Sequence, residues 1–141
     1  MRMTFPILAA LLALSACGEV APPQPATVRL PAVPGRPASG YFELLVDDDR
    51  GALTSVSSPQ AGRIEMHETM SAGNMTSMRA LDRIPAPAGD RLIFAPGGRH
   101  LMLYDVDPAI HAGSEIDLLL HFERGEPRPI TARVEAAGGP E

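Results

Sequence analysis

Short runs of alternating or continuous apolar residues recur along most of the chain, and turn residues separate them. They predict nine strands, over residues 27–30, 40–46, 52–57, 63–70, 75–81, 91–94, 99–106, 115–122 and 130–136. Between them lie turn signals such as Pro34-Gly35 and Pro96-Gly97-Gly98. No segment has a convincing helical period of useful length. The pattern predicts an all-β fold, a Greek-key β-sandwich or barrel of about eight or nine strands.

The first seventeen residues follow a different pattern. Arg2 precedes an apolar stretch at residues 5–14, which is too short to span a bilayer as a mature helix and indicates an export signal over residues 1–16. Leu14-Ser15-Ala16-Cys17 resembles the bacterial lipobox, in which the cysteine is lipidated and becomes the new N-terminus. An ordinary signal peptide with a stray buried cysteine is the alternative, but a lone free thiol is a liability in an oxidising compartment. We therefore expect a periplasmic protein held on a bacterial membrane by a lipid on Cys17.

The rest of the chain divides simply. Residues 17–26 form the lipidated cysteine and a Pro-rich tether, residues 27–136 a single β domain, and residues 137–141 a short flexible tail. The 141 residues include 12 basic and 17 acidic side chains, with a net charge of −5 and no run of basic residues. This balance argues against a nucleic-acid partner.

Soft metal donors gather in the middle of the domain. The window from residue 66 to residue 102 contains Met66, Met70, Met75, Met78 and Met102, together with His67 and His100. Thioether sulfur and imidazole nitrogen are donors suited to Cu(I), whereas zinc sites favour thiolate, imidazole and carboxylate. A copper site without thiolates also suits an exported protein, because thioethers are neutral and need no deprotonation.

Strand geometry narrows this donor set. Residues two apart share one face of a strand, so His100 and Met102 should project together. A hairpin centred on Ala72-Gly73 would place His67 opposite Met78, and Met70 opposite Met75 on the reverse face. A slip of one residue would change every assignment.

A purely structural role is the alternative for several of these residues. Methionine in strands is commonly a core filler, and we favour that reading for Met66, Met70 and Met75. Met70 and Met75 remain candidate outer metal contacts. His111 and His121 have no methionine or cysteine nearby, so we expect them to be structural or exposed to solvent.

The spacing of four of the donors resembles that of a known family. His67, ten residues, Met78, twenty-one residues, His100, one residue and Met102 is similar to the signature of the periplasmic copper chaperones called PCuAC. The likeness covers nearly all of residues 27–136. It implies a cupredoxin-like β-sandwich that binds one Cu(I) ion per chain through these four side chains. It also implies delivery of copper to cytochrome c oxidase, directly or together with Sco-type proteins.

Two features depart from that family. Some members carry a His- and Met-rich C-terminal tail for Cu(II), whereas residues 136–141 here contain neither residue type. Many members are soluble in the periplasm, whereas the lipobox predicts a membrane tether, which would concentrate the carrier near a membrane enzyme.

Other functions compete with delivery of copper. The same site could buffer copper or confer resistance, and the sequence does not distinguish storage from delivery. A metal-free lipoprotein that makes protein contacts would require the four-residue match to be accidental. A blue-copper electron carrier needs a thiolate beside two histidines, which Cys17 is badly placed to supply. No nucleophile elbow, phosphate loop or HExxH motif occurs, so we do not expect an enzyme.

Overall fold

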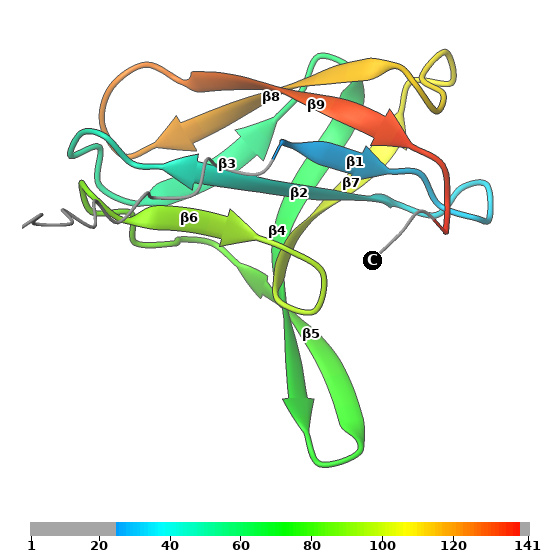
Figure 1. The fold of residues 1–141 in the computed structure, drawn as a ribbon, viewed down its shortest axis with the longest axis horizontal. Helices are drawn as coiled ribbons and strands as arrows, with labels where there is room; N and C mark the ends of the chain where they lie inside the picture. Colours follow the sequence, from blue (N-terminus) through cyan, green and yellow to red (C-terminus); the bar gives the residue numbers. More distant parts are fainter. Residues whose placement is uncertain (1–24, 139–141) are drawn as a thin grey trace, which may run out of the picture.

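The computed structural model describes residues 25–138, and these form nine β-strands without any helix (Figure 1). The predicted signal peptide, Cys17 and residues 139–141 lie outside the described residues. Each of the nine predicted strands is present, and the all-β prediction is confirmed. The strands are β1 (Thr27–Arg29), β2 (Ala38–Leu45), β3 (Leu53–Ser57), β4 (Ala61–Ala72), β5 (Met75–Leu81), β6 (Arg91–Phe94), β7 (Arg99–Val106), β8 (Glu115–Phe122) and β9 (Arg128–Glu135).

The strands join in the order β3-β8-β9-β1-β2-β7-β4-β5, and β6 pairs with β2 beside this path. Strand β1 runs parallel to β9, and the other pairs are antiparallel. Many neighbours in the sheet are far apart in sequence, as in Greek-key sandwiches. As a result β4 and β7 lie side by side in the sheet, although two other strands separate them in the sequence.

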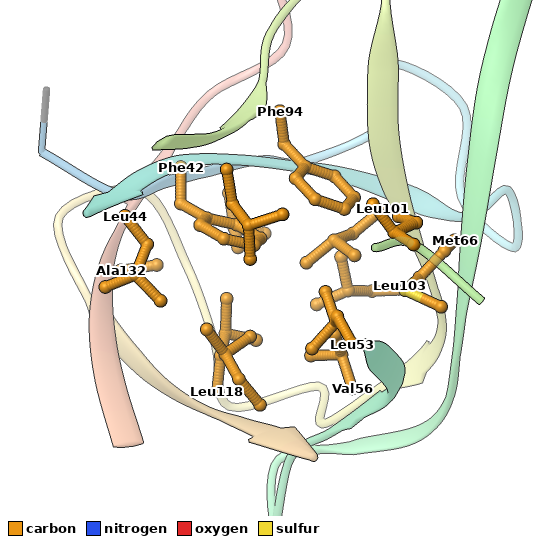
Figure 2. Close-up of a cluster of buried hydrophobic side chains, with 14 of the residues drawn as sticks. Phe42, Leu44, Leu53, Val56, Met66, Phe94, Leu101, Leu103, Leu118 and Ala132 are labelled. Atoms are coloured by element: carbon orange, nitrogen blue, oxygen red, sulfur yellow. The ribbon is translucent and has the colours of Figure 1, made fainter. Parts of the chain in front are cut away.

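One hydrophobic core fills the space that the strands enclose. Along β2 buried and partly exposed residues alternate, which is the pattern of a strand with one face toward the core. The rings of Phe42 and Phe94 stack with their centroids 4.5 Å apart. Figure 2 shows Phe94 at the top of the cluster, Leu101 and Leu103 on one side of it, and Leu118 at the opposite end. The core holds β2, β6, β7 and β8 together, and Met66 anchors β4 to it, so β4 and β7, which carry three of the four predicted donors, are held by the core.

Strand β4 extends beyond the sandwich. Its residues 61–68 pair with β7, whereas residues 66–72 pair with β5. Figure 1 shows the hairpin of β4 and β5 projecting from the body of the molecule. Every residue from 70 to 80 is exposed, so the end of this hairpin lies outside the core.

The register of this hairpin differs from the prediction. Ala72 pairs with Met75, so the turn consists of Gly73 and Asn74 and not of Ala72 and Gly73. Gly73 has a φ of +60°, and a glycine with positive φ suits the first central position of a tight two-residue turn. His67 therefore lies opposite Ala80, and the predicted pairings of His67 with Met78 and of Met70 with Met75 are wrong.

Candidate metal centre

Three adjacent strands, β7, β4 and β5, carry the four predicted donors. His67 on β4 lies directly opposite His100 on β7, and Glu65 lies opposite Met102. On the other side of β4, Thr69 lies opposite Met78. Residues paired across antiparallel strands share a face, as do residues two apart on one strand. His67, Met78, His100 and Met102 therefore lie on one face, because a register shift of two residues preserves the faces.

The alternation of side chains along β7 and β4 produces this arrangement. Leu101 and Leu103 are buried in the core, and Met66 is 4% exposed there. Their neighbours in sequence must then point to the opposite face, which is the face of the donors. The same apolar residues that anchor the two strands thus direct His67 and His100 away from the core.

The two imidazole rings lie next to each other and are largely shielded from water. Their centroids are 5.9 Å apart, the His67 side chain is 16% exposed, and His100 is 6% exposed. His67 Nε2 is 3.0 Å from a Glu65 carboxylate oxygen, and His100 Nδ1 is 3.2 Å from the Gly98 carbonyl oxygen. Within residues 25–138, neither His67 Nδ1 nor His100 Nε2 has a hydrogen-bond partner, and both are buried.

Two unpartnered buried ring nitrogens are an unusual feature. A buried polar atom without a partner costs free energy, about 1–3 kcal/mol, and most such atoms in proteins are satisfied. A neutral imidazole has one N–H and one nitrogen lone pair, and the lone pair binds metals. The pair of histidines therefore offers two nitrogen donors in one place, which fits a soft ion that also accepts thioether sulfur.

Glu65 connects the site to the adjacent surface. Its carboxylate accepts the hydrogen bond from His67 and forms an ion pair with Arg63 at 3.1 Å. The pKa of the Glu65 carboxyl is lowered, first by the hydrogen bond with His67; partial burial opposes this shift and the charge of Arg63 adds to it. Arg63 lies over the ring of Tyr104, with its guanidinium carbon 4.2 Å from the ring centroid. Glu65 was not among the residues predicted for the site, although its place two residues before His67 puts both on one strand face.

The two thioethers differ in exposure. Met102 is partly buried on the donor face of β7, between its strand neighbours Ser39 on β2 and Glu65 on β4. Met78 is 59% exposed, on the projecting hairpin. Met78 and Met102 lie diagonally from His67, toward the hairpin end and toward the body respectively. Diagonal neighbours remain within reach of long side chains.

The remaining methionines occupy different surroundings. Met66 is a core residue, as predicted. The prediction that Met70 and Met75 also fill the core is wrong, because their exposed fractions are 46% and 78%. Met70 pairs with Ser77 and Met75 with Ala72, so both lie on the face of the hairpin opposite to Met78. This placement argues against outer contacts of Met70 and Met75 with an ion at the histidines.

The other two histidines lie in local hydrogen bonds. His121 Nε2 is 2.7 Å from the Ser57 hydroxyl, and His111 Nδ1 is 3.0 Å from the Ala109 carbonyl oxygen. In the described part of the chain, no cluster of three or more His, Cys, Asp or Glu side chains could hold a metal ion. Among the described residues, the candidate metal site therefore consists of the nitrogen and sulfur donors of β4, β5 and β7.

Comparison with known proteins shows the family and the fold of this chain. Residues 23–134 match the family described as "Putative lipoprotein LpqE-like". The chain belongs to the LpqE-like family. It is 32% identical over 88 residues to "Putative lipoprotein Lxx21020" of Leifsonia xyli subsp. xyli, over 62% of this chain and 53% of that protein. It is 29% identical over 96 residues to the uncharacterized protein RP573 of Rickettsia prowazekii, over 67% of this chain and 53% of that one. The LpqE-like chain thus spans about half the length of these relatives.

Solved structures share the fold of this LpqE-like chain. The copper-bound PCuAC domain from PmoF2 is 27% identical with a TM-score of 0.63, over 81% of this chain and 91% of that domain. The apo form of the PmoF2 domain is 25% identical with a TM-score of 0.64, over 83% and 90%. A Cu(I) form of a Deinococcus radiodurans protein is 23% identical with a TM-score of 0.61, over 85% and 83%. The LpqE-like chain has the cupredoxin-like fold of PCuAC domains, which confirms the predicted resemblance.

Proposed function

We propose that this protein binds one Cu(I) ion through His67, Met78, His100 and Met102 and passes it to a copper-requiring partner by ligand exchange. Cytochrome c oxidase or a Sco-type protein is the recipient that the likeness to PCuAC suggests. In this role copper is the cargo, and the protein carries out no chemical conversion.

One observation carries the proposal. Strands β7 and β4 bring two imidazoles side by side, and each retains a buried nitrogen that has no partner among the described residues. Two thioethers lie on the same face. Two nitrogens with two sulfurs form a donor set suited to Cu(I) and poor for hard ions such as Mg²⁺ or Ca²⁺. The copper-bound PmoF2 domain, which shares the fold, supports the same choice of metal.

The exposure of the donors favours delivery over storage. Ligand exchange requires that a donor of the partner can approach the ion while a donor of the carrier leaves. Met78 is 59% exposed on the projecting hairpin, whereas His100 is buried. We infer that Met78 is the first donor to be replaced, because its thioether is neutral and accessible to a partner.

The first experiment measures Cu(I) affinity by competition with a Cu(I) chelator under reducing conditions. The double variant His67→Ala and His100→Ala should lose tight binding, whereas His111→Ala should bind like the unmodified protein. Affinity should also fall at acid pH, because imidazolium has no lone pair for a metal. Equal affinity of the double variant and the unmodified protein would show that Cu(I) does not bind at His67 and His100.

A second experiment separates delivery from storage. A strain that lacks the gene is assayed for terminal oxidase activity with and without added copper. Lost activity that copper restores supports delivery. Normal oxidase activity combined with sensitivity to copper would instead support buffering, and an unchanged strain would favour an interaction module that binds no metal.

We also propose that a lipid on Cys17 holds the domain on a bacterial membrane, in the periplasm. The relationship to the LpqE-like family supports this placement. The structure contains no membrane-spanning helix within residues 25–138. Cys17→Ser should release the exported protein from the membrane fraction, as measured by fractionation and immunoblotting. Retention of the exported variant in that fraction would contradict the lipid anchor.

A further inference from the structure

We propose that the two histidines bind the metal through different ring nitrogens, His67 through Nδ1 and His100 through Nε2, and that Glu65 is the positioning residue that imposes this choice on His67. This inference rests on the proposed Cu(I) site. Glu65 is not one of the four predicted donors, and the sequence does not show which ring nitrogen of each histidine would bind the metal.

The hydrogen bond of His67 determines which of its ring nitrogens carries the proton. A carboxylate can only accept, so the 3.0 Å contact between Glu65 and His67 requires a proton on Nε2. In the neutral ring the lone pair then lies on Nδ1. That atom is buried and has no partner in the described part of the chain. Nδ1 is therefore the nitrogen of His67 that is ready to bind a metal.

His100 has the opposite arrangement. A carbonyl oxygen also only accepts, so the 3.2 Å contact with Gly98 requires the proton of His100 on Nδ1. The lone pair lies on Nε2, which is the buried nitrogen without a partner within residues 25–138. The acceptor here belongs to the backbone of the loop between β6 and β7, so substitution of a side chain cannot remove it.

The two assignments are consistent with one shared ion. His67 and His100 lie directly opposite each other on antiparallel strands, and their ring planes are tilted by 43°. In each ring the hydrogen bond uses one nitrogen and leaves the other buried and unpartnered. A second-sphere acceptor that fixes the tautomer and orientation of a histidine ligand is a general feature of metal sites, and its loss typically lowers metal affinity about 10–100-fold.

Glu65 is itself held in place. Its ion pair with Arg63 uses the other carboxylate oxygen, Oε1, and Arg63 is in turn packed over Tyr104. Both oxygens of Glu65 are thereby engaged, one by Arg63 and one by His67. This arrangement limits rotation of the carboxylate and hence of the imidazole.

The test is nuclear magnetic resonance of the histidine rings in ¹⁵N-labelled protein. Long-range proton–nitrogen correlations report which nitrogen carries the proton in the apo protein and which one is metallated after addition of Cu(I). We expect His67 to be protonated at Nε2 and metallated at Nδ1, and His100 to show the reverse. Metallation of both rings at Nε2 would overturn the assignment.

Substitution of Glu65 tests its positioning role. Glu65→Ala should give His67 a mixture of tautomers in the apo protein and lower Cu(I) affinity about 10–100-fold. Glu65→Gln should restore much of both properties, because its amide oxygen can still accept from Nε2. An Ala variant with the tautomer and affinity of the unmodified protein would refute the role of Glu65.

Glu68→Ala is the matched control. It removes the same charge from the same strand, but Glu68 lies on the opposite face and pairs with Arg79 at 2.7 Å. This variant should keep the tautomers of both histidines and the Cu(I) affinity. If both variants lost Cu(I) affinity equally, the effect of Glu65 would be one of net charge, and its positioning role would be overturned. If the unmodified protein binds no Cu(I), the proposed function fails, whereas binding through other nitrogens overturns only this inference.

Discussion

The exposure of individual donors divides the candidate centre into two parts. His67 and His100 are shielded and held by hydrogen bonds, and Met102 is partly buried between two strands. Met78 is the exception, since more than half of it is accessible to solvent. Three shielded donors beside one accessible donor suit the proposed release of Cu(I) to a partner by ligand exchange.

The methionines of the hairpin allow a matched comparison at this scale. Met78→Leu should weaken Cu(I) binding about tenfold or more with little change in stability, because leucine has nearly the same volume but no sulfur. Met75→Leu alters an even more exposed methionine on the reverse face and should leave affinity unchanged. Chelator competition measures both, and an equal effect of the two substitutions would argue against a specific role of Met78.

At the scale of elements, β4 is the strand that assembles the centre. It pairs with β7 along its first part and with β5 along its second part, and its residues 66–68 pair with both. His67 lies within that shared stretch, so it is the donor that contacts the strands of all the others. The projecting part of β4 and β5 has no core beneath it, and its geometry depends on the turn at residues 73 and 74.

A substitution in that turn tests this dependence. Gly73 has a φ of +60°, a conformation that costs a residue with a side chain about 1–2 kcal/mol. Gly73→Ala should therefore reduce the hydrogen-exchange protection of amides at the end of the hairpin and lower Cu(I) affinity moderately. Amides of β8 and β9 should keep their protection, because the turn lies outside the core. Uniform loss of protection throughout the domain would contradict a local effect.

At the scale of the whole molecule, charged side chains in the loops form hydrogen bonds between segments that are distant in sequence. Glu123, just after β8, accepts hydrogen bonds from Arg83 at 2.7 Å and from the backbone N–H of Ala52 at 3.0 Å. These contacts lower the pKa of Glu123, with the bond from Arg83 as the largest cause. One carboxylate thus links three parts of the chain around a core that the described residues build without a disulfide.

The lowered pKa predicts how stability depends on pH. A carboxyl group with a lower pKa in the folded state stabilises the fold above its unfolded pKa, about 4.3 for glutamate, and this contribution is lost as the pH falls through the folded pKa. Glu123→Gln should therefore be less stable than the unmodified protein at pH 7, and the difference should shrink toward pH 3. Urea unfolding at both pH values measures this difference, with Glu115→Gln at the start of β8 as a control for charge. A difference that does not depend on pH would contradict the assignment.

Local sequence patterns were sufficient to predict the nine strands. The ends of β5, β6, β7 and β8 agree with the predicted ranges, and those of the other strands differ by at most two residues. Alternation within β7 also predicted that His100 and Met102 share a face. These properties depend on neighbours in sequence, and side-chain periodicity reports them directly.

Local sequence patterns did not predict how the strands pair. The turn at Gly73 and Asn74 placed the hairpin register two positions from the predicted one, because Ala72-Gly73-Asn74 permits more than one two-residue turn. His67 and His100 pair although thirty-two residues of chain lie between them, and the shared core brings their strands together. The sequence by itself determined which donor atoms are present and which strands carry them. Only the tertiary structure decided which donors are neighbours, which ring nitrogens stay free and that Glu65 holds one of the rings, because these depend on contacts that form when distant strands pack on one core.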